Sequence, residues 1–135
     1  MFADPATETL PAPAASLSGR LLYVEDNARI SELTALMLED VGIDIVQASS
    51  AEEALRIIET VELPFDMVLT DIVMPGLSGV QFARRLQERF PDMPIVLTSG
   101  YSDDLVAGYG GQYELLNKPF TRRALIDCIG RNLIN

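Results

Sequence analysis

The chain has 135 residues, of which 48% are apolar, so it is long enough for one domain with a packed core. Its 20 acidic residues outnumber its 10 basic residues, which gives a formal net charge of −10 at pH 7. Because this charge would repel phosphate backbones and anionic lipids, we expect no direct binding to nucleic acid or to membranes. The expected partners are proteins.

The amino end carries no signal-peptide pattern, and no apolar run reaches the roughly 18 residues that a membrane span needs, so we expect a cytoplasmic protein. Cys128 is the one cysteine and cannot form a disulfide within the chain. Its place on the apolar stripe of the last predicted helix indicates core packing.

Residues 1–18 are rich in alanine and proline, contain no basic residue, and show neither a helical nor a strand period. We therefore predict a flexible tail over 1–18 and a single folded domain over 19–135.

After the tail, strand-like apolar runs alternate with helix-like runs five times, which predicts an α/β fold with a doubly wound parallel sheet. The expected strands are 20–25, 43–47, 66–70, 94–98 and 114–117, and the expected helices are 28–40, 51–61, 79–89, 101–107 and 121–133. Glycines follow closely behind the fourth helix, so we expect that helix to be short.

The first helix has apolar residues at every third or fourth position, and we expect this face to pack on the sheet. These residues are Ile30, Leu33, Met37 and Val41. Gly42 is expected to end the helix. Ser50 followed by Glu53 has the spacing of a capping box, which predicts the start of the second helix.

Polar residues follow four of the predicted strands directly. They are Glu25 and Asp26, Asp71, Thr98, and Lys118. The carboxyl ends of parallel strands meet along one edge of a sheet, where open α/β sheets bind ligands. Three carboxylates, a hydroxyl and an ammonium are therefore expected to lie together.

Gathering three carboxylates creates a like-charge repulsion that a hard divalent cation would offset. Magnesium prefers about six oxygen ligands and usually takes one or two carboxylates, so Asp26 and Asp71 are expected to bind it directly. Taken alone, Asp71 would be a turn former, Thr98 a helix cap and Lys118 a surface charge. Their joint occurrence at strand ends favours a phosphate site.

The order of these residues resembles that of the receiver domain of bacterial two-component response regulators, from about Arg20 to Asn135. Glu25 and Asp26 match the family's acidic pair, and Asp71 matches its phosphoacceptor. Thr98 and Lys118 match its hydroxyl and lysine positions. The loop from Asp71 to Gly79 also resembles the family's D-x-x-M-P-x-x-x-G turn. The resemblance implies a flavodoxin-like fold with five parallel strands in the order 2-1-3-4-5.

The resemblance also implies a function: Mg²⁺-dependent transfer of a phosphoryl group from a histidine kinase or a histidine phosphotransfer protein to Asp71, which switches contacts with a downstream protein target. Such a protein is not an enzyme, apart from its self-directed phosphotransfer and autodephosphorylation. The carbonyl of Val73 would be a further metal ligand and Glu25 would act through water. Lys118 and Thr98 would contact phosphate oxygens, and the Lys118–Pro119 peptide bond would be cis.

The switch residues depart from the family pattern. Receivers usually carry an aromatic residue three positions before the lysine, where this chain has Leu115, while Tyr113 stands five positions before it. The sequence Thr98-Ser99-Gly100-Tyr101 resembles a segment of hybrid-kinase receivers. We therefore expect Tyr101 to take part in switching with Thr98.

Several alternatives remain open. The chain could be a stand-alone receiver or the receiver of a hybrid kinase. It could also be a pseudo-receiver that binds partners without phosphorylation. An aspartyl-phosphate phosphohydrolase of the haloacid-dehalogenase type is disfavoured, because such enzymes have a second Asp where this chain has Val73.

The apolar side chain of Val73 cannot orient an attacking water, so we expect slow to moderate self-dephosphorylation.

Overall fold

The computed structural model describes residues 17–60, 65–100 and 113–133. Within these residues, five parallel strands form one sheet in the order β2-β1-β3-β4-β5, as predicted. The predicted helix at 101–107, including Tyr101, lies outside the described residues, as do residues 1–16 of the predicted tail.

The elements follow one another along the chain as β1 (Gly19–Val24), α2 (Ala28–Met37), β2 (Ile43–Ala48), α3 (Ala51–Thr60), β3 (Met67–Asp71), α4 (Gly79–Arg89), β4 (Ile95–Ser99), β5 (Glu114–Asn117) and α6 (Arg122–Leu133). Strand and helix alternate as the sequence predicts from β1 to β4 and from β5 to α6. None of the helices in the described ranges is long and apolar enough to cross a membrane.

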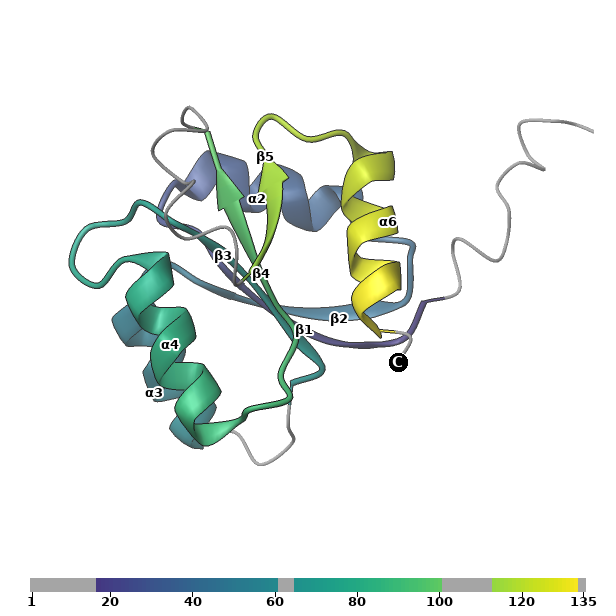
Figure 1. Cartoon of the computed structure of the whole chain (residues 1–135). Coiled ribbons are helices and arrows are strands. Elements are labelled where there is room, and N and C mark those ends of the chain that lie inside the picture. Colours follow the sequence, from purple (N-terminus) through teal and green to yellow (C-terminus); the bar gives the residue numbers. More distant parts are fainter. Residues whose placement is uncertain (1–16, 61–64, 101–112, 134–135) are drawn as a thin grey trace, which may run out of the picture.

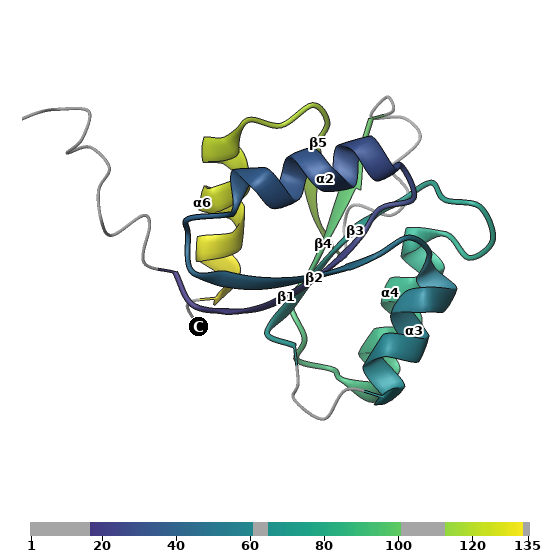
Figure 2. The same cartoon turned by 180° about the vertical axis from the view of Figure 1, so that it is seen from behind.

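The sheet is covered on both faces, by α3 and α4 on one side and by α2 and α6 on the other (Figure 1). Figure 2 shows the same three layers from behind. Alternate residues of β1 serve the two cores: Leu22 packs in the core beneath α3 and α4, and Tyr23 in the core beneath α2 and α6. Cys128 is fully buried in the second core, which confirms its predicted packing role.

Helix α2 differs from its prediction in length. It ends at Met37, while Gly42 lies beyond a run of turns and has a φ of 99° at the entry to β2. The prediction that Gly42 ends the helix is therefore wrong. Arg122 of α6 donates from Nε to the Met37 carbonyl oxygen at 2.9 Å, which satisfies one of the carbonyls left free at the helix end.

The buried face of α2 also differs from its prediction. Leu33, which we expected to pack on the sheet, is 52% exposed, whereas Ser31 and Thr34 are buried. Thr34 donates from Oγ1 to the carbonyl oxygen of Ile30 and contacts the hydroxyl of Tyr23 on β1. A polar group on the sheet thus meets polar residues of the helix. The apolar period misplaced Leu33, whereas Met37 and Val41 pack in the core beneath α2 and α6 as predicted.

Two serines cap helices that begin near the carboxyl edge of the sheet. Ser50 accepts from the Glu53 backbone N–H at 3.0 Å, but the Glu53 carboxylate accepts from Ser49 rather than from Ser50, so only half of the predicted box forms. A complete capping box, which the sequence analysis missed, joins Ser78 and Gln81 at the start of α4. This cap fixes the end of the loop that follows β3.

Candidate functional site

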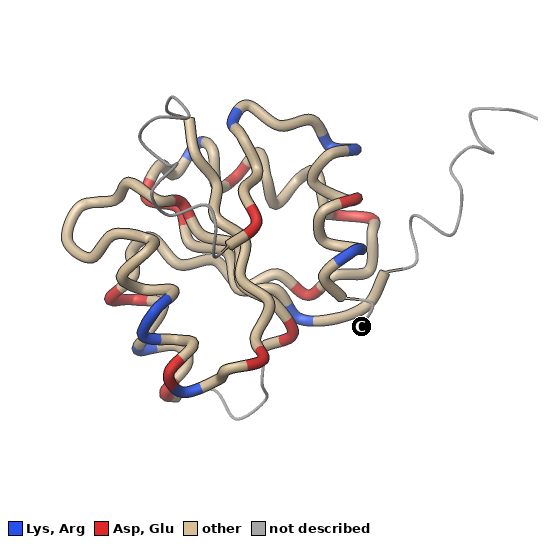
Figure 3. Tube along the Cα trace, in the orientation of Figure 1, with Lys and Arg blue, Asp and Glu red and all other residues tan. Residues whose placement is uncertain are grey.

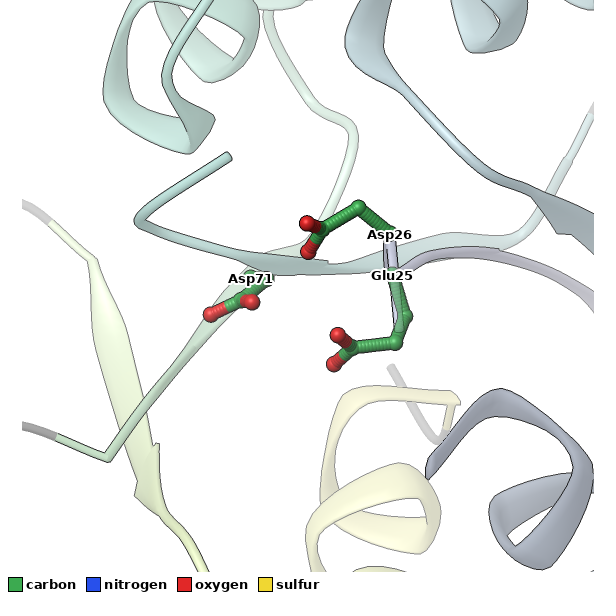
Figure 4. Close-up of side chains that lie close together, drawn as sticks. All are labelled: Glu25, Asp26 and Asp71. Carbon is green, nitrogen blue, oxygen red and sulfur yellow. The ribbon is translucent and has the colours of Figure 1, made fainter. Parts of the chain in front are cut away.

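Three carboxylates meet at the carboxyl edge of the sheet. Glu25 and Asp26 follow β1 and Asp71 ends β3, and one oxygen from each lies within 4.8 Å of the others. Figure 4 shows the three side chains gathered between the two strand ends. They line an open cavity of about 700 Å³ together with Lys118 and Val73. The structure therefore brings together residues that are distant in sequence.

Lys118 connects two of these carboxylates. Its Nζ donates to Glu25 Oε1 at 2.7 Å and to Asp71 Oδ2 at 3.2 Å. The Glu25 side chain is 1% exposed and that of Lys118 is 16% exposed, so most of their surface is out of water. The backbone N–H of Lys118 donates to Ser99 on β4, and the Lys118–Pro119 peptide bond is cis, as the resemblance implied. A buried carboxylate needs such a partner.

The pKa values of Asp71 and Lys118 are both raised, for different reasons. Burial, followed by the negative charge of Glu25, raises the pKa of Asp71 above its ordinary value, although Lys118 opposes this. Burial alone would lower the pKa of Lys118, but its hydrogen bond to Glu25 and the charge of Asp71 raise it. Lys118 is therefore cationic at neutral pH, and its one charge offsets only part of the charge of three carboxylates.

This donor set fits a magnesium ion. Magnesium is a hard cation that binds carboxylate oxygens and relieves the repulsion between them. Asp26 is exposed and Asp71 is buried, and both line the open cavity. The three clustered carboxylates, which belong to Glu25, Asp26 and Asp71, could hold the ion, and Val73 lines the same cavity.

The loop after Asp71 is held at several points. Ile72 donates its N–H to Thr98 on β4 at 3.1 Å, and Gly79 donates its N–H to the Ile72 carbonyl at 2.8 Å. A Cβ atom at Gly79 would clash with the carbonyl oxygen of Asp71, so this close approach requires glycine. Glu52 of α3 accepts from the Leu77 N–H at 3.1 Å. Sequence reasoning missed Glu52, because its partner lies 25 residues away.

The residues predicted to switch are only partly described. Thr98 pairs with Asp71 in the register of β3 and β4, is fully buried, and makes no hydrogen bond from its hydroxyl to the described part of the chain. Tyr101 lies outside the described residues. Tyr113 is buried and its hydroxyl donates to Gln87 of α4 at 3.1 Å. Leu115 packs partly buried against the same core.

Tyr23 is the residue whose environment the sequence analysis missed. Its side chain is fully buried. However, its hydroxyl lies 3.5 Å from Glu25 Oε1 and 3.2 Å from Thr34 Oγ1. The signal was available, because residues two apart in a strand share a face of the sheet.

The charged residues of α4 and α6 are mostly basic. Each of these helices carries three arginines and one acidic residue, and Figure 3 shows the basic and acidic positions along them. The paired arginines of α4 and α6 are exposed. These pairs are Arg84–Arg85 and Arg122–Arg123.

Comparisons with known proteins agree with this geometry. The family model for the response regulator receiver domain matches residues 21–130. The chain is 33% identical over 113 residues to the hydrogenase transcriptional regulatory protein HoxA of Cupriavidus necator, a match that covers 81% of this chain and 23% of HoxA. It is 32% identical over 129 residues to the sensor kinase CckA of Brucella abortus, covering 92% of this chain and 14% of that kinase.

A solved structure of the response regulator protein TrrA from Thermotoga maritima, in complex with Mg²⁺ and BeF, has a TM-score of 0.76 and 30% sequence identity. The match covers 87% of this chain and all of TrrA. The chain thus spans a small part of the two curated relatives named above and the full length of a solved receiver structure. Its strand order, the acidic cluster between β1 and β3 and the match over most of its length place it in one family: the chain belongs to the response regulator receiver domains of two-component systems.

Proposed function

We propose that the protein accepts a phosphoryl group on Asp71 from a phosphohistidine and thereby switches its contacts with other proteins. The observation that carries this proposal is the meeting of three carboxylates with Lys118, whose Nζ contacts two of them. This arrangement supplies a nucleophile, a place for a metal ion and a cation for phosphate oxygens.

Mg²⁺ is the proposed cofactor. Asp26 and Asp71 would bind it directly, the Val73 carbonyl would add a ligand, and Glu25 would act through water. When bound, the ion offsets the negative charge of the carboxylates and of the incoming phosphoryl group. The complex of the similar protein TrrA with Mg²⁺ and BeF supports this choice of metal.

The chemical step belongs to Asp71. One carboxylate oxygen attacks phosphorus in line, an oxygen–phosphorus bond forms, and the phosphorus–nitrogen bond of the donor breaks with its electron pair returning to the imidazole. Lys118 donates to a phosphoryl oxygen and the Thr98 hydroxyl donates to another. Val73 offers no group to orient a hydrolytic water, so the rate at which the acyl phosphate hydrolyses is slow to moderate.

The proposed donor is a histidine kinase or a histidine phosphotransfer protein in the cytoplasm, and the proposed receiver of the signal is a downstream protein target. Movement of Thr98 toward the phosphoryl group, together with Tyr101, would change the surface that this target contacts. A stand-alone receiver and a receiver within a hybrid kinase use the same chemistry, so the proposal holds for both.

The test is an intact-mass measurement after incubation with Mg²⁺ and acetyl phosphate. The wild type should gain the mass of one phosphoryl group, and Asp71→Asn or removal of Mg²⁺ with EDTA should abolish the gain. Asp127→Asn, which changes an exposed carboxylate on α6, is the matched control and should keep it. If the wild type gains no mass with acetyl phosphate or with a phosphorylated histidine kinase, the proposal is wrong and a pseudo-receiver is favoured.

A further inference from the structure

The hydroxyl of Tyr23 lies between two hydrogen-bond acceptors. Its ring is fully buried in the core beneath α2 and α6. Its oxygen is 3.2 Å from Thr34 Oγ1 and 3.5 Å from Glu25 Oε1. Burial raises the pKa of Tyr23 well above its ordinary value, although the hydrogen bond with Thr34 opposes this, so the hydroxyl keeps its proton at neutral pH.

A single hydroxyl proton cannot serve both acceptors well. In the first arrangement, Thr34 donates to the Ile30 carbonyl at 2.8 Å and Tyr23 donates to Thr34. In the second arrangement, both hydroxyls rotate, so that Thr34 donates to Tyr23 and Tyr23 donates to Glu25. Hydroxyl groups rotate freely between such partners, and each arrangement leaves both hydroxyls hydrogen-bonded without moving the backbone.

The state of Lys118 decides which arrangement is preferred. In this structure Glu25 Oε1 accepts from Lys118 at 2.7 Å, and Glu25 Oε2 accepts from the Asn27 N–H at 3.0 Å. Both oxygens of the carboxylate thus have a donor, and Tyr23 donates its proton to the nearer Thr34. If Lys118 turns toward a phosphoryl group on Asp71, Oε1 loses its charged donor while the Glu25 side chain stays 1% exposed. A buried carboxylate oxygen without a donor is costly.

We propose that Tyr23 is a positioning residue that replaces Lys118 as the donor to Glu25 Oε1 when Lys118 moves to the phosphoryl group. The inference rests on the proposed function, because only a ligand on Asp71 draws Lys118 away. Tyr23 then holds Glu25 in place for the metal site, and Thr34 donates to Tyr23 in turn. The phosphoryl-bound state is stabilised relative to the free state by this exchange of donors.

Two variants test this exchange of donors. One removes the donor that replaces Lys118, and the other removes the acceptor that competes with Glu25. Tyr23→Phe removes the replacement donor and keeps the ring in the core. Thr34→Val keeps the shape of the side chain but removes the competing acceptor, which leaves Glu25 as the partner of Tyr23 in both states. The readout is the affinity for beryllofluoride, a phosphoryl mimic, in the presence of Mg²⁺, measured by isothermal titration calorimetry.

Tyr23→Phe should weaken beryllofluoride binding on the order of tenfold, the size expected for a hydrogen bond to a buried charge. Thr34→Val should strengthen beryllofluoride binding by about threefold. The variant removes two hydrogen bonds of Thr34 from the free state, those with the Ile30 carbonyl and with Tyr23. From the bound state it removes only the hydrogen bond that Thr34 would donate to Tyr23. A merely structural role for this network would weaken binding in both variants. Circular dichroism melting curves show that each variant is folded before it is titrated.

Failure of the inference is distinguishable from failure of the proposed function. If the wild type binds no beryllofluoride, the proposed function itself is wrong. If the wild type binds and Tyr23→Phe binds equally well, or if both variants weaken binding alike, Tyr23 does not replace Lys118 and the phosphoacceptor proposal still stands. Should Tyr23→Phe fail to fold, Thr34→Val decides alone, since weaker binding in that variant overturns the exchange and tighter binding supports it.

Discussion

The two faces of the sheet are covered in different ways. On one face, the buried side chains of α4 are apolar, among them Val80, Phe82 and Leu86. On the other face, α2 buries Ser31 and Thr34 while its leucines at 33 and 36 are 52% and 58% exposed. Helix α4 thus buries apolar side chains, whereas α2 buries two hydroxyl side chains beside the partly buried Met37, although both helices pack on the same sheet.

The cause of this difference lies in the middle of the sheet. Strand β1 presents Leu22 and Val24 to the core beneath α4, and it presents Tyr23 to the opposite face, with Glu25 following in the same alternation. A buried hydroxyl and a buried carboxylate require polar partners, and Thr34 supplies one of them. Both faces therefore bury an apolar core, and the α2 face in addition supplies a polar partner beside the acidic site.

Truncation of the α4 face should have the largest effect. Phe82→Ala removes a fully buried ring from the core beneath α3 and α4, and it should lower the free energy of unfolding by about 3–5 kcal/mol. Urea denaturation followed by circular dichroism measures the loss. Arg85→Ala, an exposed change on the same helix, is the matched control. A loss under about 1 kcal/mol in Phe82→Ala would mean that this core is not close-packed.

Magnesium should have the next largest effect, and it should act through the acidic edge. At a concentration 100 times its dissociation constant, Mg²⁺ should raise the free energy of unfolding by about 2.7 kcal/mol. Asp26→Ala should remove most of this gain, because it deletes one of the three clustered carboxylates. Asp127→Ala changes an exposed carboxylate outside the cluster and should keep it. An undiminished gain in Asp26→Ala would place the bound ion elsewhere.

Removal of the phosphoacceptor charge should stabilise the metal-free protein. Burial and the charge of Glu25 raise the pKa of Asp71, which means that its ionised form is disfavoured in the folded state. With EDTA present at pH 7, Asp71→Asn should raise the free energy of unfolding on the order of 1 kcal/mol. Urea denaturation of the two proteins measures the difference.

The sign of the pH dependence follows from that raised pKa. Above the folded-state pKa, Asp71 is ionised in both the folded and unfolded states and the full penalty is present. As the pH falls through the folded-state pKa, the folded protein takes up the proton first and the penalty disappears. The advantage of Asp71→Asn should therefore be largest near neutral pH and shrink on acidification. An advantage that grows as the pH falls would contradict the raised pKa.

Much of the fold and of the site followed from patterns along the chain. The strand ends carried Glu25, Asp71 and Lys118 to one edge because parallel strands align their carboxyl ends, and the structure places these three side chains within hydrogen-bonding and metal-binding reach of one another. The bounds of the strands were predictable to within one residue because each apolar run ends near a polar residue.

The contacts that sequence reasoning missed join residues with no local pattern between them. Glu52 reaches the Leu77 N–H from another helix, and Tyr23 reaches Thr34 across the layer between sheet and helix. The face of the first helix was predicted from apolar spacing alone, which placed Met37 and Val41 correctly but not Leu33. That spacing could not show that the strand beneath the helix presents the Tyr23 hydroxyl, which takes Thr34 as its partner.

The exposed leucines of α2 give the smallest expected effect, and they test the comparison between the two faces of the sheet most directly. Leu36 stands on the helix with 58% of its surface exposed, whereas Leu38, just past the helix end, is 2% exposed. Leu36→Ala should change the free energy of unfolding by no more than about 0.5 kcal/mol, while Leu38→Ala, its matched control, should lose about 2–5 kcal/mol. Urea denaturation of both variants decides the matter. If Leu36→Ala lost as much as Leu38→Ala, the helix would be burying its leucines after all. Thr34 would then face away from Tyr23, and the polar support of Glu25 would have to come from elsewhere.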